Sequence, residues 1–143
     1  MAQATYDDAN LILRLYEMRR EEKMREARSW FVANYKPKAA ADIQKIAPMG
    51  TPENAKMRMV ITYWDMVASF ITAGVLNPEL FFASGREMLL VYIRLEGILG
   101  EMREFNKDAN YLKNLELASK QFVDHMNKTS PGAYDALKAR VGG

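Results

Sequence analysis

The segment at residues 53–73 constrains the fold most, because apolar side chains cover most of its circumference when it is drawn as a helix. Thr51 and Pro52 supply a helix start before it, and Gly74 follows it. The apolar positions form two adjacent stripes at helical spacing: Val60, Trp64, Val67, Ile71 and Met59, Tyr63, Met66, Phe70. The polar positions form one narrow line: Arg58, Thr62, Asp65, Ser69 and Thr72. A helix of this kind is buried between several neighbours, which predicts an all-α helical bundle.

Helix start and stop signals divide the rest of the chain, which we expect to form a single domain over residues 1–143. No alternating apolar and polar run typical of a strand competes with the helical period. The predicted elements are a long N-terminal helix at about 6–35, a mobile connection at about 36–51, core helices at about 53–73, 85–105 and 109–127, and a short C-terminal helix at about 131–140. The prediction is an all-α bundle of four main helices plus short helical segments.

The chain contains no cysteine and one histidine, and this composition removes several kinds of chemistry. Without cysteine there is no disulfide framework, thiolate metal site or cysteine nucleophile. One histidine excludes a histidine-cluster metal site within a single chain, and the Glu-x-x-His pairs of a di-iron bundle are missing. We therefore predict no metal, no cofactor and no catalytic residue, and favour a protein that is not an enzyme.

The distribution of charge argues against a nucleic-acid partner. Twenty Lys and Arg against 18 Asp and Glu give a net charge of +2, and the basic excess lies in the first predicted helix and the loop after it. A nucleic-acid surface gathers Lys and Arg on one face without acids between them. In this helix the acids alternate with the bases: Glu17, Glu21, Glu22 and Glu26. The pattern is typical of a solvated helix surface.

The chain shows no signal for a membrane or for export. The longest uncharged stretch, residues 66–78, is too short to cross a bilayer, which takes roughly 20 apolar residues. No basic segment precedes the first apolar cluster, as a secretory signal would require. We predict no transmembrane segment and a cytoplasmic location.

Asp65 is the main candidate for a functional residue, because it lies on the polar line of a mostly buried helix and has no Lys or Arg three or four positions away. In one interpretation this line faces solvent. In a second, Asp65 is buried and forms an ion pair with Arg94 or Arg86 of the next core helix. In a third, it contributes to a site for a ligand.

The ligand site would lie between the core helices and would take a small apolar or anionic molecule. Its candidate residues are Asp65, Trp64, Tyr92 and Arg94. An enzyme would instead need Asp65 to meet Glu87 or Glu101 in a cleft as a pair of carboxylates.

The first predicted helix is about 12 Å longer than the core helices, at roughly 1.5 Å per residue. It therefore overhangs the bundle, bends, or packs against a second subunit. Its far end carries apolar and aromatic side chains that would need cover in a dimer: Trp30, Phe31 and Tyr35. We take these three as candidate interface residues and predict a homodimer.

Several short motifs between residues 57 and 117 form a recognisable series. They are the aromatic–acid step at Trp64–Asp65, the turn Gly74–Leu80, and the helix from Ser84 that carries Tyr92. The series resembles a family of small helical bacterial proteins known only as a domain of unknown function. Many of its members carry an N-terminal membrane helix, in whose place this chain has its charged first helix. The resemblance implies a helical fold and brings no known activity, substrate or catalytic residue.

From the sequence, the favoured function is a non-catalytic interaction or regulatory module that acts as a homo-oligomer with a protein partner of unknown identity. The alternative is a helical bundle that binds a small ligand near Asp65. The two differ in where apolar surface is left open, on the outside of the bundle or between its helices.

Overall fold

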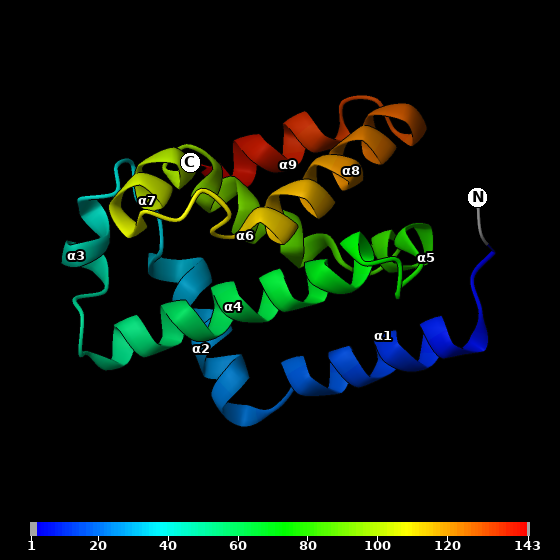
Figure 1. Cartoon of the computed structure of the whole chain (residues 1–143), viewed down its shortest axis with the longest axis horizontal. Coiled ribbons are helices and arrows are strands. Elements are labelled where there is room, and N and C mark those ends of the chain that lie inside the picture. The colour runs from blue at the N-terminus through cyan, green and yellow to red at the C-terminus, as the bar shows by residue number, and fades with distance from the viewer. Residues whose placement is uncertain (1–2, 143) are drawn as a thin grey trace.

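The central element is α4 (Pro52–Thr72), which the other long helices surround. A computed structural model describes residues 3–142 of the chain and contains helices and no strand over that range, which confirms the all-α prediction. The other helices are α1 (Tyr6–Arg19), α2 (Glu22–Asn34), α3 (Asp42–Ile46), α5 (Pro78–Phe82), α6 (Arg86–Glu96), α7 (Leu99–Asn106), α8 (Lys113–Thr129) and α9 (Ala133–Gly142). Figure 1 shows α4 running through the middle, with α1 on one side of it and α8 on the other.

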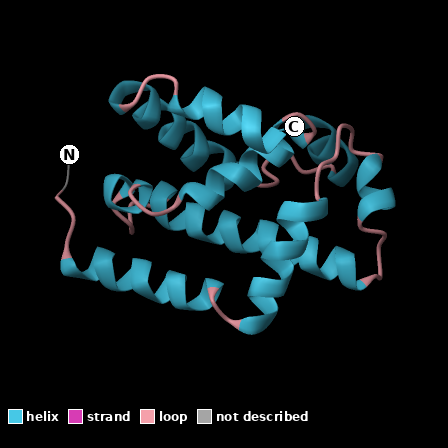
Figure 2. Ribbon diagram, turned by 180° about the vertical axis from the view of Figure 1, so that it is seen from behind, coloured by secondary structure: helices cyan, strands magenta, loops and turns pink. Residues whose placement is uncertain are grey.

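The apolar circumference of α4 explains this arrangement. Its main neighbours are α8 and α2, and α6 packs against it as well. Seen from behind, α2 crosses the face of α4 that is hidden in Figure 1 (Figure 2). The helix begins where the sequence predicts, because the Thr51 hydroxyl accepts a hydrogen bond from Asn54 N at 3.2 Å and caps the first turn. Trp64 is 2% exposed and Val67 is fully buried, as the prediction of a buried helix requires.

The segment predicted as one helix over residues 6–35 is two helices, α1 and α2, because the chain turns at Arg20 and Glu21. Of the three alternatives for this long segment, the structure shows the bend. The Glu21 carboxylate accepts a hydrogen bond from Met24 N at 3.1 Å and caps α2. The Arg28 side chain donates to Arg19 O at 3.2 Å, at the end of α1. The bend lets both halves of the segment bury apolar side chains against the core, which a straight helix of this length would not achieve.

The same bend corrects the predicted dimer interface. Phe31 is 1% exposed and Tyr35 is fully buried, and their rings stack with centroids 4.6 Å apart. Trp30 is partly buried and packs against the same core. The expectation that this end of the helix lacks cover is therefore wrong, since the chain's own core covers it.

Two further predicted helices have different bounds. The helix expected over 85–105 breaks after Gly97 into α6 and α7. The helix expected over 109–127 begins later, at Lys113, since residues 107–112 form a turn with Leu112 in the left-handed conformation at φ 56°. Asp108 accepts from Asn110 N within this turn and does not cap a helix. The Arg103 side chain donates to Tyr111 O at 2.8 Å, which fixes the turn against α7.

Residues 36–51, which we expected to form a mobile connection, contain α3 and two attachments to the bundle. Asn54 donates a side-chain hydrogen bond to Ala47 O at 2.9 Å, and Ala47 is fully buried. Lys38 Nζ donates to Gly142 O at 3.2 Å, which links the connection to the end of α9.

α1 is the most peripheral of the long helices and lies along one edge of the molecule (Figure 1). Only Asp8 and Leu15 are buried in it, and its main contacts are with α2 and α5. Asp8 holds the start of α1, because its carboxylate accepts from Thr5 N at 2.8 Å and from Asn77 N, at the start of α5, at 2.8 Å. The Tyr63 hydroxyl donates to Leu15 O at 2.6 Å and holds the last turns of α1 on α4.

The attachment of α1 through Asp8 predicts a dependence of stability on pH. The backbone N–H groups of Asn77 and Thr5 lower the pKa of Asp8 below its ordinary value. A lowered pKa means that the stabilisation is complete above the ordinary pKa of about 3.9 and is lost as the pH falls through the lower value of the folded protein. We expect Asp8→Asn to reduce the free energy of unfolding at pH 7, and the difference from wild type to shrink below about pH 4.

Urea unfolding at a series of pH values measures both effects. Asp7→Asn is the matched control, because Asp7 is exposed in the same turn of α1. A difference between wild type and Asp8→Asn that stays constant down to pH 2 would contradict the assignment.

Candidate functional site

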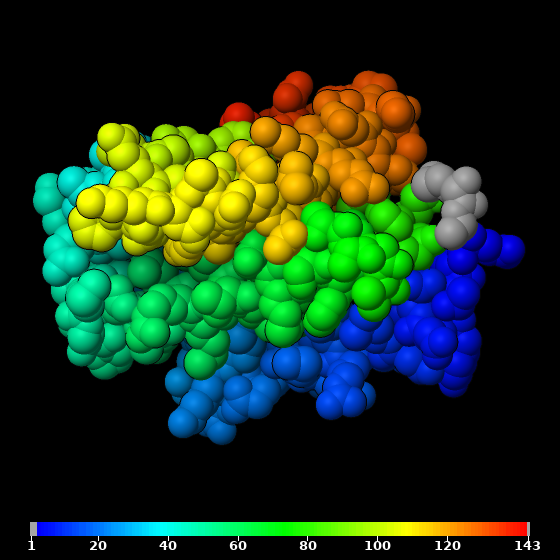
Figure 3. Space-filling model, viewed as in Figure 1, coloured from blue at the N-terminus to red at the C-terminus, as the bar shows by residue number. Residues whose placement is uncertain are grey.

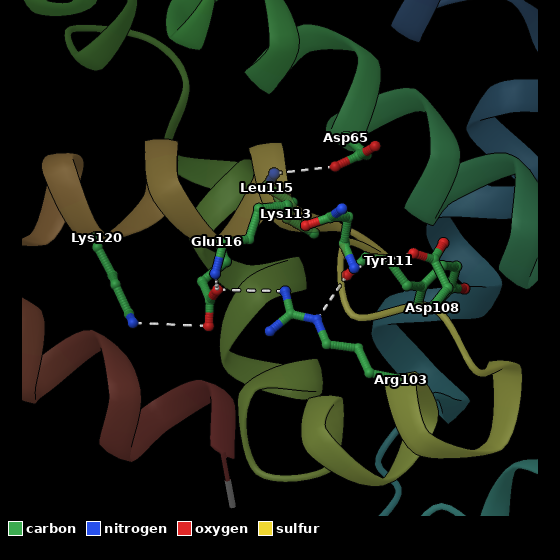
Figure 4. A network of polar contacts seen from close by, with 9 residues as sticks. Asp65, Arg103, Asp108, Tyr111, Lys113, Leu115, Glu116 and Lys120 are labelled. Atoms are coloured by element: carbon green, nitrogen blue, oxygen red, sulfur yellow. Dashed lines mark hydrogen bonds and ion pairs between the residues drawn. The ribbon is translucent and has the colours of Figure 1, made fainter.

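Asp65 lies on α4 beside the start of α8, and its partner is a backbone amide. Its Oδ1 accepts a hydrogen bond from Leu115 N at 2.9 Å (Figure 4). Leu115 is in the first turn of α8, and the residue that precedes this helix, Leu112, has an apolar side chain that cannot cap it. Asp65 therefore supplies the cap of α8 from another helix, where a negative charge also meets the positive end of the helix dipole. The predicted ion pair of Asp65 with Arg94 or Arg86 is wrong.

A polar network next to Asp65 fixes the turn before α8. The Arg103 guanidinium donates to Tyr111 O at 2.8 Å and to Glu116 Oε1 at 3.2 Å, and Glu116 also pairs with Lys113 and Lys120 (Figure 4). Burial raises the pKa of Tyr111, and the charge of Asp65 adds to the effect. These contacts hold the turn and the start of α8 together, so the arrangement is best explained as structural.

The Arg94 guanidinium donates hydrogen bonds to backbone carbonyls at the ends of two helices. It donates to Val141 O on α9 at 2.9 Å and to Tyr35 O after α2 at 2.9 Å. It also donates to Phe31 O at 3.3 Å and Val32 O at 3.1 Å. Burial lowers the pKa of Arg94. The side chain thus satisfies carbonyls that a helix end leaves without partners, and it is not free to bind a ligand.

The four residues predicted to bind a ligand, Asp65, Trp64, Tyr92 and Arg94, do not line one common pocket. Burial raises the pKa of Tyr92 to about 12, with the charges of Glu96 and Glu116 adding to it, so its hydroxyl stays neutral at pH 7. Only Trp64 lines the pocket described next; Asp65, Tyr92 and Arg94 do not.

An apolar pocket of about 270 Å³ lies between α1 and the side of the core formed by α4, α5 and the turn after α5. We call it the α1 pocket. Its lining residues are Ile12, Leu13, Leu15, Tyr16, Arg19, Tyr63, Trp64, Phe81, Ser84 and Gly85. In Figure 3, α1 (blue) lies at the edge of the molecule against the green atoms of the neighbouring core helices.

Aromatic rings form the inner wall of the α1 pocket. The ring of Trp64 meets that of Tyr63 edge-on at 5.0 Å between centroids and that of Phe81 at 6.4 Å. The Phe81 ring occupies the space in which a Cβ at position 85 would sit, so any larger residue there would force the ring to move. Leu13 and Tyr16 form the outer rim and are 59% and 47% exposed. The pocket therefore has a buried aromatic floor and an apolar opening.

Charged groups meet the α1 pocket at one end, where α1 turns into α2. The Arg19 guanidinium lies 5.3 Å from the centre of the Tyr16 ring and 5.5 Å from that of Trp64, within the range of cation–π attraction. Glu87 on α6 is close by but is bound by Arg28 through hydrogen bonds of 2.9–3.0 Å. Burial raises the pKa of Tyr63 to about 12, which keeps its hydroxyl a neutral donor to Leu15 O.

The carboxylates expected of an enzyme do not form a pair here. Asp65 caps α8, Glu87 is bound by Arg28, and Glu101 is exposed. Within residues 3–142, no three His, Asp or Glu side chains lie close enough together to hold a metal ion.

Sequence reasoning missed most of the α1 pocket. Trp64 was a candidate, but Tyr16, Arg19 and Phe81 were not. A signal was present, since Ile12, Leu15, Tyr16 and Arg19 share one face of a helix at spacings of three and four. Only the fold-back of α1 shows that this face meets the aromatic side of α4.

The fold and the site define a small all-α protein with an apolar pocket beneath its first helix. The chain belongs to the family described as a domain of unknown function (DUF4760), which matches residues 4–122. This match confirms the resemblance seen over residues 57–117 and extends it to α1, so it includes every residue that lines the α1 pocket. No curated protein and no solved structure matches the chain significantly. Across the described part of the chain, none of the helices has the length and apolar character needed to span a membrane.

The role of Asp65 as a cap predicts a defined loss of stability. We expect Asp65→Ala to lower the free energy of unfolding by about 1 kcal/mol, as removal of a capping side chain does. Asp65→Asn keeps an acceptor oxygen and should lose less. Urea unfolding gives the free energies, and hydrogen exchange at the Leu115 amide reports the lost bond directly.

Asp124→Ala is the control, because Asp124 is exposed on the same helix, α8. Unchanged protection of the Leu115 amide in Asp65→Ala would show that Asp65 does not cap α8.

Proposed function

We propose that the protein is a non-catalytic binding module that holds a small apolar ligand in the α1 pocket. The observation that carries the proposal is the pocket itself, an opening of about 270 Å³ with Trp64, Tyr63 and Phe81 on its wall. Ligand sites are concave, mostly apolar and lined by aromatic side chains with few polar groups, and this pocket has that composition. The proposed ligand site thus lies under α1, next to Trp64, and differs from the site that the sequence predicted near Asp65.

The weak attachment of α1 supports ligand entry. The helix buries only Asp8 and Leu15. The polar contacts that hold it among the described residues include Asp8 with Asn77 N, Tyr63 with Leu15 O, Arg28 with Arg19 O and the longer ion pair of Arg19 with Glu87. Segments with few buried contacts open locally at a small free-energy cost. A small outward movement of α1 would therefore open the pocket without disturbing α4.

Trp64 provides a direct reporter of binding. The chain has two tryptophans, so Trp30→Phe leaves Trp64 as the single one. We expect titration of this variant with decanol to shift the Trp64 fluorescence in a saturable way, because the probe would lie against the indole ring. Isothermal titration calorimetry provides a second measure of the affinity.

Two variants test the location. Gly85→Ala forces the Phe81 ring to move and should weaken decanol binding about tenfold or more, whereas Gly97→Ala, where a Cβ meets nothing within 4 Å, should leave binding unchanged. Leu13→Gln alters the exposed rim of the α1 pocket without touching the core and should also weaken binding. The proposal fails if decanol gives no saturable change, or if it binds Leu13→Gln and Gly85→Ala as well as the parent variant.

The second candidate function is the homo-oligomeric interaction module predicted from the sequence. The observation that favours it is a set of exposed apolar side chains on α1 and the adjoining face of α4. Met18 is 45% exposed and Met59 is 39% exposed, and both line a shallow groove between α1, α2 and α4. A second copy of the chain would cover this groove, whereas Phe31 and Tyr35 are already covered. The homodimer and the cytoplasmic location stay predictions.

Light scattering measures the oligomeric state. We expect a dimer at tens of micromolar for the wild type and a monomer for the double variant Met18→Glu, Met59→Glu, because the charges would face each other in the dimer. Val75→Glu is the control, since Val75 is also exposed but lies in the turn after α4. A wild type that is monomeric at this concentration would exclude the dimer.

A further inference from the structure

One charged side chain in the α1 pocket has unused hydrogen-bond donors. Arg19 is only 17% exposed in its side chain, yet its guanidinium donates no hydrogen bond to any residue in the part of the chain that the structure describes. Its contacts are the rings of Tyr16 and Trp64 and one carboxylate oxygen of Glu87 at 3.9 Å, which is beyond hydrogen-bond length. A largely buried cation ordinarily has its donors satisfied.

Glu87 does not neutralise Arg19, because it is already committed to Arg28. The Arg28 guanidinium donates to both carboxylate oxygens of Glu87 at 2.9–3.0 Å, a bidentate arrangement. The three side chains together carry one positive charge in excess. This excess lies on Arg19, which is the member of the group that lines the α1 pocket.

A second unused donor is buried inside the same wall and does not reach the pocket surface. Trp64 lines the α1 pocket and is 2% exposed, and its Nε1 has no hydrogen-bond partner among the described residues. The unpaired donors at the pocket surface are therefore those of Arg19, on an otherwise apolar lining. A ligand that complements it needs acceptor oxygens and a negative charge at one end and an apolar body at the other.

We propose that the ligand of the α1 pocket is a small carboxylic acid with an apolar body, whose carboxylate binds the Arg19 guanidinium. This inference rests on the proposed function and adds the class of ligand to it. Guanidinium and carboxylate groups form two parallel hydrogen bonds, and this geometry favours a carboxylate over a neutral oxygen. An apolar cavity of about 150 Å³ admits benzene, so a pocket of the present size admits an alkyl chain of roughly ten carbons.

The experiment compares decanoate with decanol on the Trp30→Phe variant at pH 7, by Trp64 fluorescence and calorimetry. The two probes share one chain length and differ in the charge of the head group. We expect decanoate to bind about tenfold tighter or more, since hydrogen bonds to a charged group contribute more than neutral ones. Adding Arg19→Met should weaken decanoate binding more than decanol binding and so remove this preference, while Arg19→Lys should keep part of it.

Arg14→Met is the matched control, because Arg14 is exposed on α1 and does not line the pocket. Thermal unfolding of each variant shows that the fold is retained; Arg28 contacts the main-chain oxygen of residue 19, which substitution leaves in place. Equal binding of decanoate and decanol overturns the carboxylate inference and leaves the apolar pocket standing. A decanoate preference that survives Arg19→Met overturns the assignment to Arg19. If neither probe binds, the proposed function fails as well.

Discussion

The structure depends on the burial of α4, whose apolar side chains point in nearly every direction. A helix of this kind is stable in water only if other helices remove most of its surface from solvent, and the gain grows with the apolar area covered. α2, α6 and α8 cover most of it. The side that carries Tyr63 and Trp64 is left to α1, which is held at its two ends and covers it incompletely. The α1 pocket is the space that this incomplete cover leaves.

Several charged side chains near the core satisfy backbone groups at helix ends, which need partners because a helix leaves its terminal amides and carbonyls unpaired. Asp65 and Asp8 accept from amides at the start of α8 and α5, and Arg94 donates to carbonyls at the ends of α2 and α9. Asp65 and Arg94 are ligand candidates in the sequence, but their acceptors and donors are used within the fold. Arg19 differs from them, because its guanidinium lies beside an apolar pocket and donates no hydrogen bond to the residues that the structure describes.

Membership of DUF4760 covers the part of the chain that builds this site. The match ends at residue 122, within α8, so α9 lies outside it while α1 and the whole lining of the α1 pocket lie inside. The feature on which the proposed function depends therefore belongs to the family's domain.

The sequence by itself determined the helical class, the burial of α4 and the start of α4, because helical periodicity and capping residues act within a few positions of the chain. It also placed Trp64 in the core. Only the tertiary structure decided that the chain bends at Arg20 and Glu21, that Phe31 and Tyr35 are covered, and that Asp65 caps α8. The reason is physical: the bend falls in a run of charged residues that has no apolar pattern, and a polar side chain's partner depends on which helix packs beside it. Once the bend brings α1 back onto α4, Arg19 lies beside Trp64, and these two residues, far apart in the sequence, line the same pocket.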